Sequence, residues 1–180
     1  MKNAIIFHGS GSTPNDVWYP YLKAKLEAKG YKVSVPVLTA DQPSPLKIWL
    51  PLALKENYDK DTVLIGHSAG APLILAVLEN IKVKVKQAIL VAGFITPLPA
   101  NKGKNPILQD KYGWEKIKKH CENFIFINAD NDPWGCDEKQ GKMMQEKLGG
   151  KLIVNHEGHM GSDSFTQPYK EFPFLIKLIN

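Results

Sequence analysis

Short apolar segments rich in Val, Ile and Phe alternate along this chain with longer segments whose apolar residues recur at helical spacing. Strands are expected at residues 4–7, 32–35, 62–65, 88–92, 124–128 and 152–155. These runs are brief and rich in Val, Ile or Phe, as strands buried on both faces are. Strands that alternate with helices predict an α/β fold of three layers, with a mostly parallel sheet between two layers of helices.

Six other segments carry apolar residues at the spacing of a helix. Helices are expected at residues 19–29, 46–54, 69–78, 114–120, 137–148 and 169–179. Gly30 follows the first of them, and glycine commonly ends helices because it adopts the left-handed conformation without strain. Pro51 falls inside the second, where it removes a backbone donor, so we expect that helix to be broken.

The connection over residues 93–111 is the longest expected loop. It holds three prolines and shows neither helical nor strand periodicity. Long loops in a compact domain often act as lids or substrate-binding segments. An irregular crossover between two elements explains the pattern equally well, so both interpretations stay open.

The length and composition are those of one globular domain over residues 1–180. A chain of 180 residues, 43% hydrophobic and 23% charged, can bury one continuous core. No apolar run is long enough for a signal peptide or a bilayer span, so we expect neither export nor a membrane anchor. Two cysteines, Cys121 and Cys136, do not make a disulfide framework, and we expect reduced thiols in a cytoplasmic protein.

The net charge of +5 raises the question of a nucleic acid partner. The lysines gather at residues 82–86 and 116–120. Neither cluster is interleaved with aromatic residues, and no nucleic-acid-binding motif is present. We interpret the clusters as solvated edges of a strand and a helix, and we expect no nucleic acid partner.

Residues 66–70 read Gly-His-Ser-Ala-Gly and carry the strongest chemical signal. The pattern Gly-x-Ser-x-Gly is weak alone, but here it follows an expected buried strand and precedes an apolar helix. In such a turn, small neighbours let the chain bend sharply so that the serine hydroxyl projects from the sheet. We therefore expect Ser68 to be a nucleophile, in preference to a serine that merely caps the helix.

A serine hydroxyl is nucleophilic at neutral pH only when a base removes its proton and a third group orients that base. The expected fifth strand is followed by two carboxylates, Asp130 and Asp132. Asp132 is the better candidate for the orienting acid because Pro133 restricts its backbone and because it lies deeper in the loop. Asp130 is explained by capping of the turn.

Two histidines follow the expected sixth strand. His159 is the better candidate for the base because Gly158 places it in a tight turn, whereas His156 ends the strand. The run His-Glu-Gly-His also suggests a zinc site, but it lacks the i, i+4 spacing of a helical zinc motif, and its glycine disfavours a helix. We expect neither a metal nor a cofactor.

Two backbone amides are candidates for holding the negative charge that develops on a carbonyl oxygen under attack. The Ala69 N–H lies in the same turn as Ser68, at the start of a helix. The Ser10 N–H lies in the glycine-rich loop after the first strand. This loop lacks the third glycine and the later acidic residue of a dinucleotide-binding fingerprint, so we interpret it as an oxyanion loop.

Three aromatic residues fall in or near the loops at this edge of the expected sheet. They are Trp18, Phe94 and Trp134, and they are candidates for an apolar substrate pocket. Loop aromatics more often anchor the loop to the core, so a purely structural role competes with this assignment.

Four segments of this chain resemble those of the compact α/β-hydrolases of the retinoblastoma-binding-protein-type small serine hydrolases. They are the loop at residues 7–11, the motif at 66–70, the acid segment at 130–133 and the Gly-His at 158–159. The resemblance covers nearly the full chain. It implies a six-stranded sheet of order 2-1-3-4-5-6, no separate cap domain, and a triad of Ser68, Asp132 and His159. Binding to the retinoblastoma protein is not implied, because the motif Leu-x-Cys-x-Glu is absent.

The expected reaction is hydrolysis of a small-molecule ester through an acyl-enzyme intermediate. The same residues would serve amide or thioester cleavage. A catalytically weak binding or regulatory protein on a hydrolase fold is the main alternative. The physiological substrate and the oligomeric state stay open.

Overall fold

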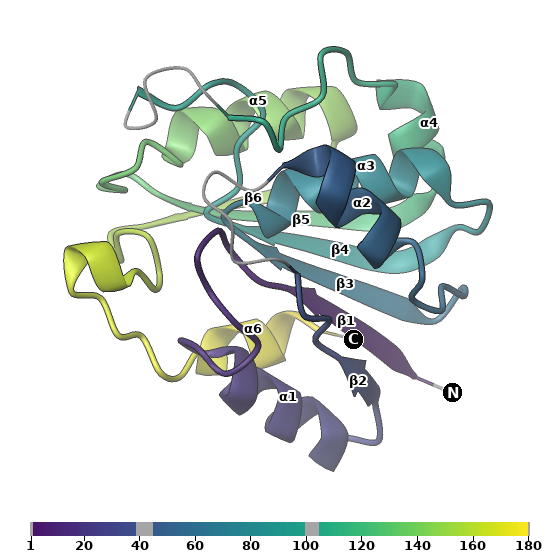
Figure 1. Ribbon diagram of the computed structural model, residues 1–180, viewed down its shortest axis with the longest axis horizontal. Helices are drawn as coiled ribbons and strands as arrows, with labels where there is room; N and C mark the ends of the chain where they lie inside the picture. The colour runs from purple at the N-terminus through teal and green to yellow at the C-terminus, as the bar shows by residue number, and fades with distance from the viewer. Residues whose placement is uncertain (1, 39–44, 100–104, 180) are drawn as a thin grey trace.

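The computed structural model describes residues 2–38, 45–99 and 105–179 of the chain. Within them six strands form one sheet, in which every neighbouring pair is parallel. The strands are β1 (Asn3–Phe7), β2 (Lys32–Ser34), β3 (Thr62–His67), β4 (Val85–Val91), β5 (Cys121–Ala129) and β6 (Lys151–Asn155). Their order, β2-β1-β3-β4-β5-β6, confirms the expected fold class and strand order (Figure 1).

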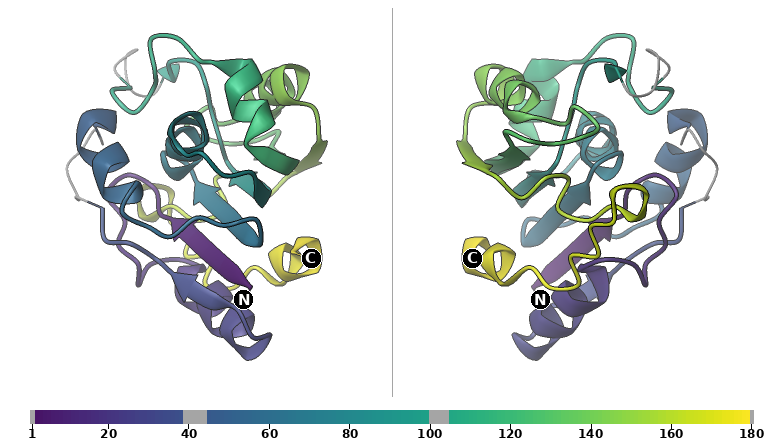
Figure 2. Two further views of the ribbon diagram at one scale, coloured as in Figure 1. Left: turned by 90° about the vertical axis from the view of Figure 1, so that its right-hand side faces the viewer. Right: turned by 90° about the vertical axis from the view of Figure 1, so that its left-hand side faces the viewer.

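Helices cover both faces of this sheet. They are α1 (Tyr19–Ala28), α2 (Leu46–Ala53), α3 (Gly70–Asn80), α4 (Trp114–Lys119), α5 (Glu138–Leu148) and α6 (Pro173–Leu178), with a 3-10 helix, η2, at Asp163–Phe165. Helices α1 and α6 lie together on one face, and α2, α3, α4 and α5 cover the other (Figure 2). Because all the strands are parallel, their carboxyl ends meet at one edge, where α/β sheets build their sites.

The second helix is short but unbroken, so the expected break at Pro51 was wrong. Helix α2 runs from Leu46 to Ala53 with Pro51 inside it. Pro51 cannot donate a hydrogen bond to the carbonyl of Lys47, but Lys47 is exposed, so water can replace that donor. Trp49 is buried from this helix and packs in the core. Tertiary packing therefore stabilises a helix that its own backbone bonds would not.

The last helix is shorter than its apolar pattern predicted. The pattern extends over residues 169–179, whereas α6 begins only at Pro173. A residue before proline is disfavoured in the helical conformation, and Phe172 accordingly has a φ of −142°. Tyr169, with a φ of 38°, is also not helical. The proline thus determines where the helix starts.

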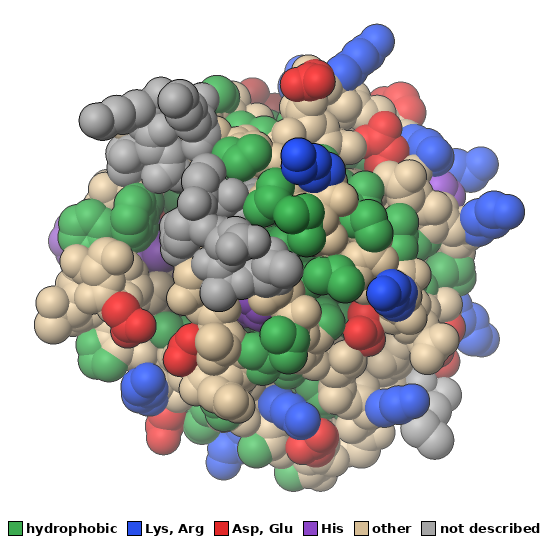
Figure 3. Space-filling view, viewed as in Figure 1, with side chains coloured by type: hydrophobic (Ala, Val, Ile, Leu, Met, Phe, Trp, Pro, Cys, Tyr) green, Lys and Arg blue, Asp and Glu red, His purple; other side chains and the backbone are tan. Residues whose placement is uncertain are grey.

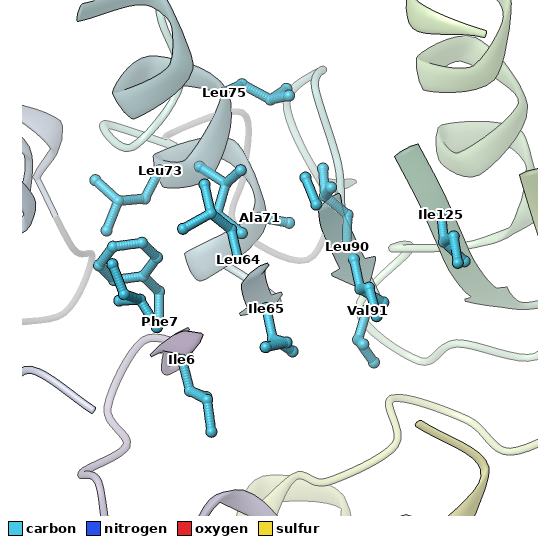
Figure 4. Close-up of a cluster of buried hydrophobic side chains, with 14 of the residues drawn as sticks. Ile6, Phe7, Leu64, Ile65, Ala71, Leu73, Leu75, Leu90, Val91 and Ile125 are labelled. Atoms are coloured by element: carbon cyan, nitrogen blue, oxygen red, sulfur yellow. The ribbon is translucent and has the colours of Figure 1, made fainter. Parts of the chain in front are cut away.

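The central strands are buried on both faces. Successive side chains of β1, β3 and β4 alternate between the two sides of the sheet. Those directed toward α3 are Phe7, Leu64 and Leu90, and those directed away from it are Ile6, Ile65 and Val91 (Figure 4). All six are buried, which explains why these strands appear in the sequence as continuous apolar runs.

The lysine clusters lie at the surface, as expected of solvated edges. Lys82 and Lys84 are exposed just before β4, and Lys116, Lys118 and Lys119 are exposed on α4. On the face shown in Figure 3, lysine side chains are dispersed over the right and lower parts and mixed with acidic ones. None of the helices in the described residues is both long and apolar enough to cross a membrane.

Candidate active site

Ser68 lies in a sharp turn between the end of β3 and the start of α3. Its φ angle is 52°, in the left-handed region that residues with a side chain rarely occupy. Two backbone hydrogen bonds hold this conformation. The Ser68 N–H donates to the Val91 carbonyl at 2.9 Å, and the Ala71 N–H donates to the Ser68 carbonyl at 2.9 Å. Backbone strain that the fold maintains in this way is typical of functional sites.

The glycines on either side of Ser68 are required by close backbone contacts. A Cβ atom on Gly66 would lie 2.5 Å from the carbonyl oxygen of Gly70. A Cβ atom on Gly70 would collide with the carbonyl oxygen of Phe7. The two glycines therefore let β1, β3 and the start of α3 pack tightly around the serine, which is the arrangement of a nucleophile elbow.

His159 and Asp132 meet in the loops that follow β6 and β5. Nδ1 of His159 lies 2.7 Å from Oδ2 of Asp132, and the two side chains are 6% and 0% exposed. The other carboxylate oxygen, Oδ1, accepts a hydrogen bond from the Trp134 backbone N–H at 2.8 Å. Because Oδ2 accepts from Nδ1–H, the carboxylate holds the imidazole in the tautomer whose Nε2 can take up a proton.

The alternative carboxylate and histidine also pair with each other. Nδ1 of His156 lies 2.6 Å from Oδ1 of Asp130, but these side chains are 78% and 51% exposed. Neither residue lines the cavity that contains Ser68 and His159. The structure therefore brings together the preferred residues, and it places the two alternatives at the surface.

A cavity of about 240 Å³ contains both Ser68 and His159. It is lined by residues 9–12, 67–69, 94, 98, 105–107, 134, 159 and 161–164. One wall is apolar and comes from the connection between β4 and α4, through Phe94, Leu98 and Ile107. Residues 100–104 of that connection lie outside the described residues.

The described part of this connection is irregular, and Phe94, Leu98 and Ile107 within it line the cavity. The side chain of Gln140, on α5, fixes its path. Oε1 of Gln140 accepts from the Ile95 N–H at 3.0 Å, and Nε2 donates to the Thr96 hydroxyl at 2.6 Å. These bonds hold the segment that carries Phe94.

Of the three predicted pocket aromatics, Phe94 and Trp134 line the cavity and Trp18 does not. Trp18 is fully buried, and its indole N–H donates to the Met160 carbonyl at 2.9 Å. Its ring packs edge to face on His67, with the ring centroids 5.6 Å apart. The expected pocket role of Trp18 is therefore wrong, because core packing occupies the whole indole.

The lining residues Leu98, Ile107, Ser162 and Asp163 were missed from the sequence. Leu98 and Ile107 lie in the proline-rich connection, and that composition was a signal that could have found them. Ser162 and Asp163 follow no recognisable motif. They reach the cavity because the chain turns back after β6 at Gly161, which has a φ of 124°.

Both predicted amide donors, Ser10 and Ala69, lie at the cavity. Ala69 immediately precedes α3, and the first N–H groups of a helix have no acceptor within it. The loop after β1 comes so close that a Cβ on Gly9 would lie 3.2 Å from Cβ of Ser68. The Gly9 N–H is itself bound to the Tyr19 hydroxyl at 3.1 Å, and Ser10 follows Gly9 in the part of this loop that lines the cavity.

Two further histidines near the site are buried in neutral form. Burial, with a smaller contribution from the neighbouring His159, lowers the pKa of His67 to about 3. Burial likewise lowers the pKa of His8. The Nδ1–H of His8 donates to the Gly9 carbonyl at 2.8 Å, and its Nε2 accepts from the Leu38 N–H at 3.1 Å. Both ring nitrogens of His8 therefore have a hydrogen-bond partner when Nε2 carries no proton.

Among the described residues, the ligand atoms of Asp132, Cys136 and His159 lie within 4.8 Å of one another. Carboxylate, thiolate and imidazole are all zinc ligands in type. However, Asp132 and His159 already bind each other, and burial raises the pKa of Cys136 well above its usual value, which disfavours a thiolate. His156, which belonged to the suspected zinc run, is not part of this group.

Comparison with known proteins finds hydrolases that are similar to this chain over most of its length. The protein YdeN of Bacillus subtilis strain 168 is 27% identical over 173 residues, which cover 90% of this chain and 87% of YdeN. The serine hydrolase RBBP9 of Rattus norvegicus is 28% identical over 168 residues, covering 89% of this chain and 87% of RBBP9.

Solved structures share the fold. The crystal structure of the ydeN gene product superposes with a TM-score of 0.90 and 23% identity, covering 99% of this chain and 96% of that one. The methylesterase MES16 from Arabidopsis has a TM-score of 0.63 and 14% identity, covering 99% of both chains. The family model described as serine hydrolase matches residues 4–178. The chain therefore belongs to the serine hydrolase family.

Proposed function

We propose that this hydrolase cleaves small carboxylic esters by acyl transfer through Ser68, with His159 as the base and Asp132 as the acid that orients it. One observation carries the proposal. A serine on a strained turn shares a cavity with a histidine whose Nδ1–H is bound to a buried carboxylate. This is the arrangement that activates a serine hydroxyl at neutral pH.

In the first step, Nε2 of His159 takes the proton of the Ser68 hydroxyl while Oγ bonds to the carbonyl carbon of the ester. The carbonyl oxygen becomes negative and is held by the Ser10 and Ala69 N–H groups. The intermediate then expels the alcohol, which receives the proton from His159, and the acyl group stays on Ser68. Asp132 stabilises the positive charge that His159 carries during this step.

In the second step, His159 takes a proton from a water molecule, and the resulting hydroxide adds to the acyl carbon. Collapse of this intermediate breaks the bond to Oγ, and His159 returns the proton to Ser68. The carboxylic acid leaves and the enzyme is restored. No metal or cofactor has a role in this cycle.

The size and lining of the cavity support a small substrate. Its volume of about 240 Å³ is below the roughly 300–1,000 Å³ of pockets that take drug-sized ligands. Phe94, Leu98, Ile107 and Trp134 present apolar surface to the acyl or alcohol group. MES16 from Arabidopsis, a protein of similar fold, is named a methylesterase, which is consistent with an ester as the substrate.

The test is turnover of p-nitrophenyl acetate, butyrate and octanoate, together with labelling by a fluorophosphonate, in the wild type and in Ser68→Ala. We expect Ser68→Ala to lose labelling and to lower kcat by a factor on the order of 10³ or more. Ser34→Ala, on strand β2 and outside the cavity lining, is the matched control. Unchanged labelling and turnover in Ser68→Ala would overturn the proposal.

Substrate comparison separates the remaining possibilities. Matched thioester and amide substrates, measured under the same conditions, decide between an esterase, a thioesterase and an amidase. A binding protein on a hydrolase fold would show no saturable, Ser68-dependent turnover of any of the three. We expect the ester to be cleaved with the highest kcat/KM.

A further inference from the structure

The backbone of His159 is held by two side chains, one from eight residues later in the chain and one from 92 residues earlier. His159 lies in a turn, outside the strands and helices, so no regular ladder supports its peptide groups. Its N–H donates to Oε1 of Gln167 at 2.8 Å, and its carbonyl lies 2.9 Å from Nε2 of His67. With Asp132 on Nδ1, His159 is thus held at three points.

We propose that Gln167, His67 and Tyr19 form a positioning clamp that sets the place of His159 and links it to the oxyanion loop. The inference rests on the proposed role of His159 as the base. None of the three residues exchanges a proton with the substrate. They act by fixing the residue that does.

Gln167 is itself anchored on its backbone. It forms an antiparallel bridge with Ser162, with N–H to carbonyl distances of 2.8 and 2.9 Å in the two directions. Its amide packs directly on Gly158, where a Cβ atom would collide with Nε2 of Gln167. Gly158 has a φ of 59°, so a side chain there is disfavoured for a second reason. The turn that carries His159 is therefore shaped around the Gln167 amide.

His67 is bound at both ring nitrogens. A carbonyl oxygen can only accept, so Nε2 of His67 must carry the hydrogen that bonds to the His159 carbonyl. In the neutral ring Nδ1 is then an acceptor, and it takes the hydrogen of the Tyr19 hydroxyl at 2.7 Å. Burial keeps the ring neutral because it lowers the pKa to about 3.

Tyr19 connects this ring to the loop after β1. Its hydroxyl accepts from the Gly9 N–H at 3.1 Å and donates to His67. The chain of hydrogen bonds thus runs from Gly9 through Tyr19 and His67 to the His159 carbonyl. Its two ends are a backbone donor and a backbone acceptor, so its polarity cannot reverse. The loop that carries Ser10 and the turn that carries His159 are held in one buried network.

The functional consequence follows because the rate of acyl transfer is sensitive to small displacements of the reacting groups. A displacement of about 1 Å at a reacting group can lower the rate on the order of 100-fold. Removing one bond of the clamp should therefore lower kcat while leaving the apolar cavity, and with it KM, nearly unchanged. Replacing a residue that served only stability would lower the melting temperature, but it would not lower kcat selectively while KM stays the same.

The first experiment compares Tyr19→Phe with Tyr58→Phe. Both variants delete one hydrogen-bonded tyrosine hydroxyl, but that of Tyr58 is part-buried and donates to the Ala53 carbonyl at 2.7 Å, away from the site. We expect Tyr19→Phe to lower kcat and the fluorophosphonate labelling rate by about tenfold or more, with KM within about twofold of the wild type. Tyr58→Phe should change neither kcat nor the labelling rate.

The second experiment compares Gln167→Leu with Gln87→Leu. The Gln87 amide also bonds to the backbone, although as a donor, because its Nε2 donates to the Leu178 carbonyl at 2.9 Å; Gln87 lies near the amino end of β4. We expect only Gln167→Leu to lower kcat and the labelling rate. Circular dichroism and the melting temperature show whether each variant is folded.

A third comparison tests whether Tyr19 acts through His67. In a His67→Leu background, Tyr19→Phe should have no further effect on kcat, because the chain is already broken. His67→Gln, which can still present an N–H to the His159 carbonyl, should retain more activity than His67→Leu.

The outcomes separate this inference from the proposed function. If Tyr19→Phe and Gln167→Leu behave like their controls while Ser68→Ala is inactive, the clamp is overturned and the acyl-transfer mechanism stands. If Ser68→Ala retains full turnover, the proposed function fails first. Two results together support the clamp. Tyr19→Phe and Gln167→Leu lower kcat without changing KM, and Tyr19→Phe has no further effect on kcat in the His67→Leu background.

Discussion

Two histidine–aspartate pairs lie in the same two loops, and they differ in burial rather than in chemistry. His159 with Asp132 and His156 with Asp130 have nearly equal distances between nitrogen and oxygen, 2.7 and 2.6 Å. The first pair is almost fully buried beside Ser68, and the second is open to solvent. Only in the first pair do the surroundings hold both partners in one orientation.

The difference follows from how water competes for the bonds. An exposed ion pair contributes little, because water solvates both partners and salt screens them. In a buried pair the same bond fixes the orientation and the tautomer of the ring, because no solvent partner replaces it. Burial therefore turns one of two similar pairs into a candidate catalytic pair.

The largest expected effect comes from making the same change in both pairs. Asp132→Asn should lower kcat by a factor on the order of 10³ to 10⁴, because an amide does not hold His159 in the tautomer that accepts a proton. Asp130→Asn should leave kcat near that of the wild type. Ester turnover by the two variants measures the difference. Equal losses would show that burial does not separate the pairs.

A medium effect is expected in acid from the burial of His67, which lies behind the first pair. His67 has a pKa of about 3 in the folded protein, against about 6.5 when unfolded. Between these values the unfolded chain binds a proton that the folded ring refuses, so the free energy of unfolding falls as the pH falls. The slope from this ring is at most about 1.4 kcal/mol per pH unit.

The charged groups around His67 do not reverse this sign. Asp132 favours a proton on the ring, while His159 and His8 disfavour it, and burial outweighs them all. Denaturant unfolding of wild type and His67→Gln between pH 4 and 7 measures the effect. The slope should flatten in His67→Gln; a slope as steep as that of the wild type would contradict the assignment.

The smallest effect is expected at the exposed pair. His156→Ala should change the free energy of unfolding by no more than about 0.5 kcal/mol, because the pair is solvated. That difference should shrink further in 1 M salt. Urea unfolding at low and high salt measures it. A loss that is large and independent of salt would mean that this pair, too, is held by its surroundings.

The fold was predictable because its signals are local. Short runs rich in Val, Ile or Phe mark the six strands, and the runs are most continuous in β1, β3 and β4, which are buried on both faces, whereas the edge strands β2 and β6 are partly exposed. Gly66 and Gly70 mark the turn around Ser68, since any side chain there would collide with backbone. Pro51 was misread, because burial of Trp49 stabilises a helix that backbone rules alone would break.

The site was predictable in part. Order along the chain and position after the strands indicated Ser68, Asp132 and His159, whereas nothing local showed that Trp18 packs in the core behind His67. The role of Gln167 had no sequence signal. Its side chain reaches His159 only because the chain after β6 turns back on itself.

By itself, the sequence determined the α/β alternation, the place of the turn at Ser68 and the residue types available for chemistry, because these depend on neighbours along the chain. The tertiary structure decided which aspartate and histidine are buried together, which aromatic residues face the cavity and what holds the backbone of His159. Those properties depend on contacts between residues that are not neighbours along the chain, such as Asp132 and His159, 27 residues apart, and His67 and His159, 92 residues apart. Water is excluded from such contacts only when the whole chain has packed.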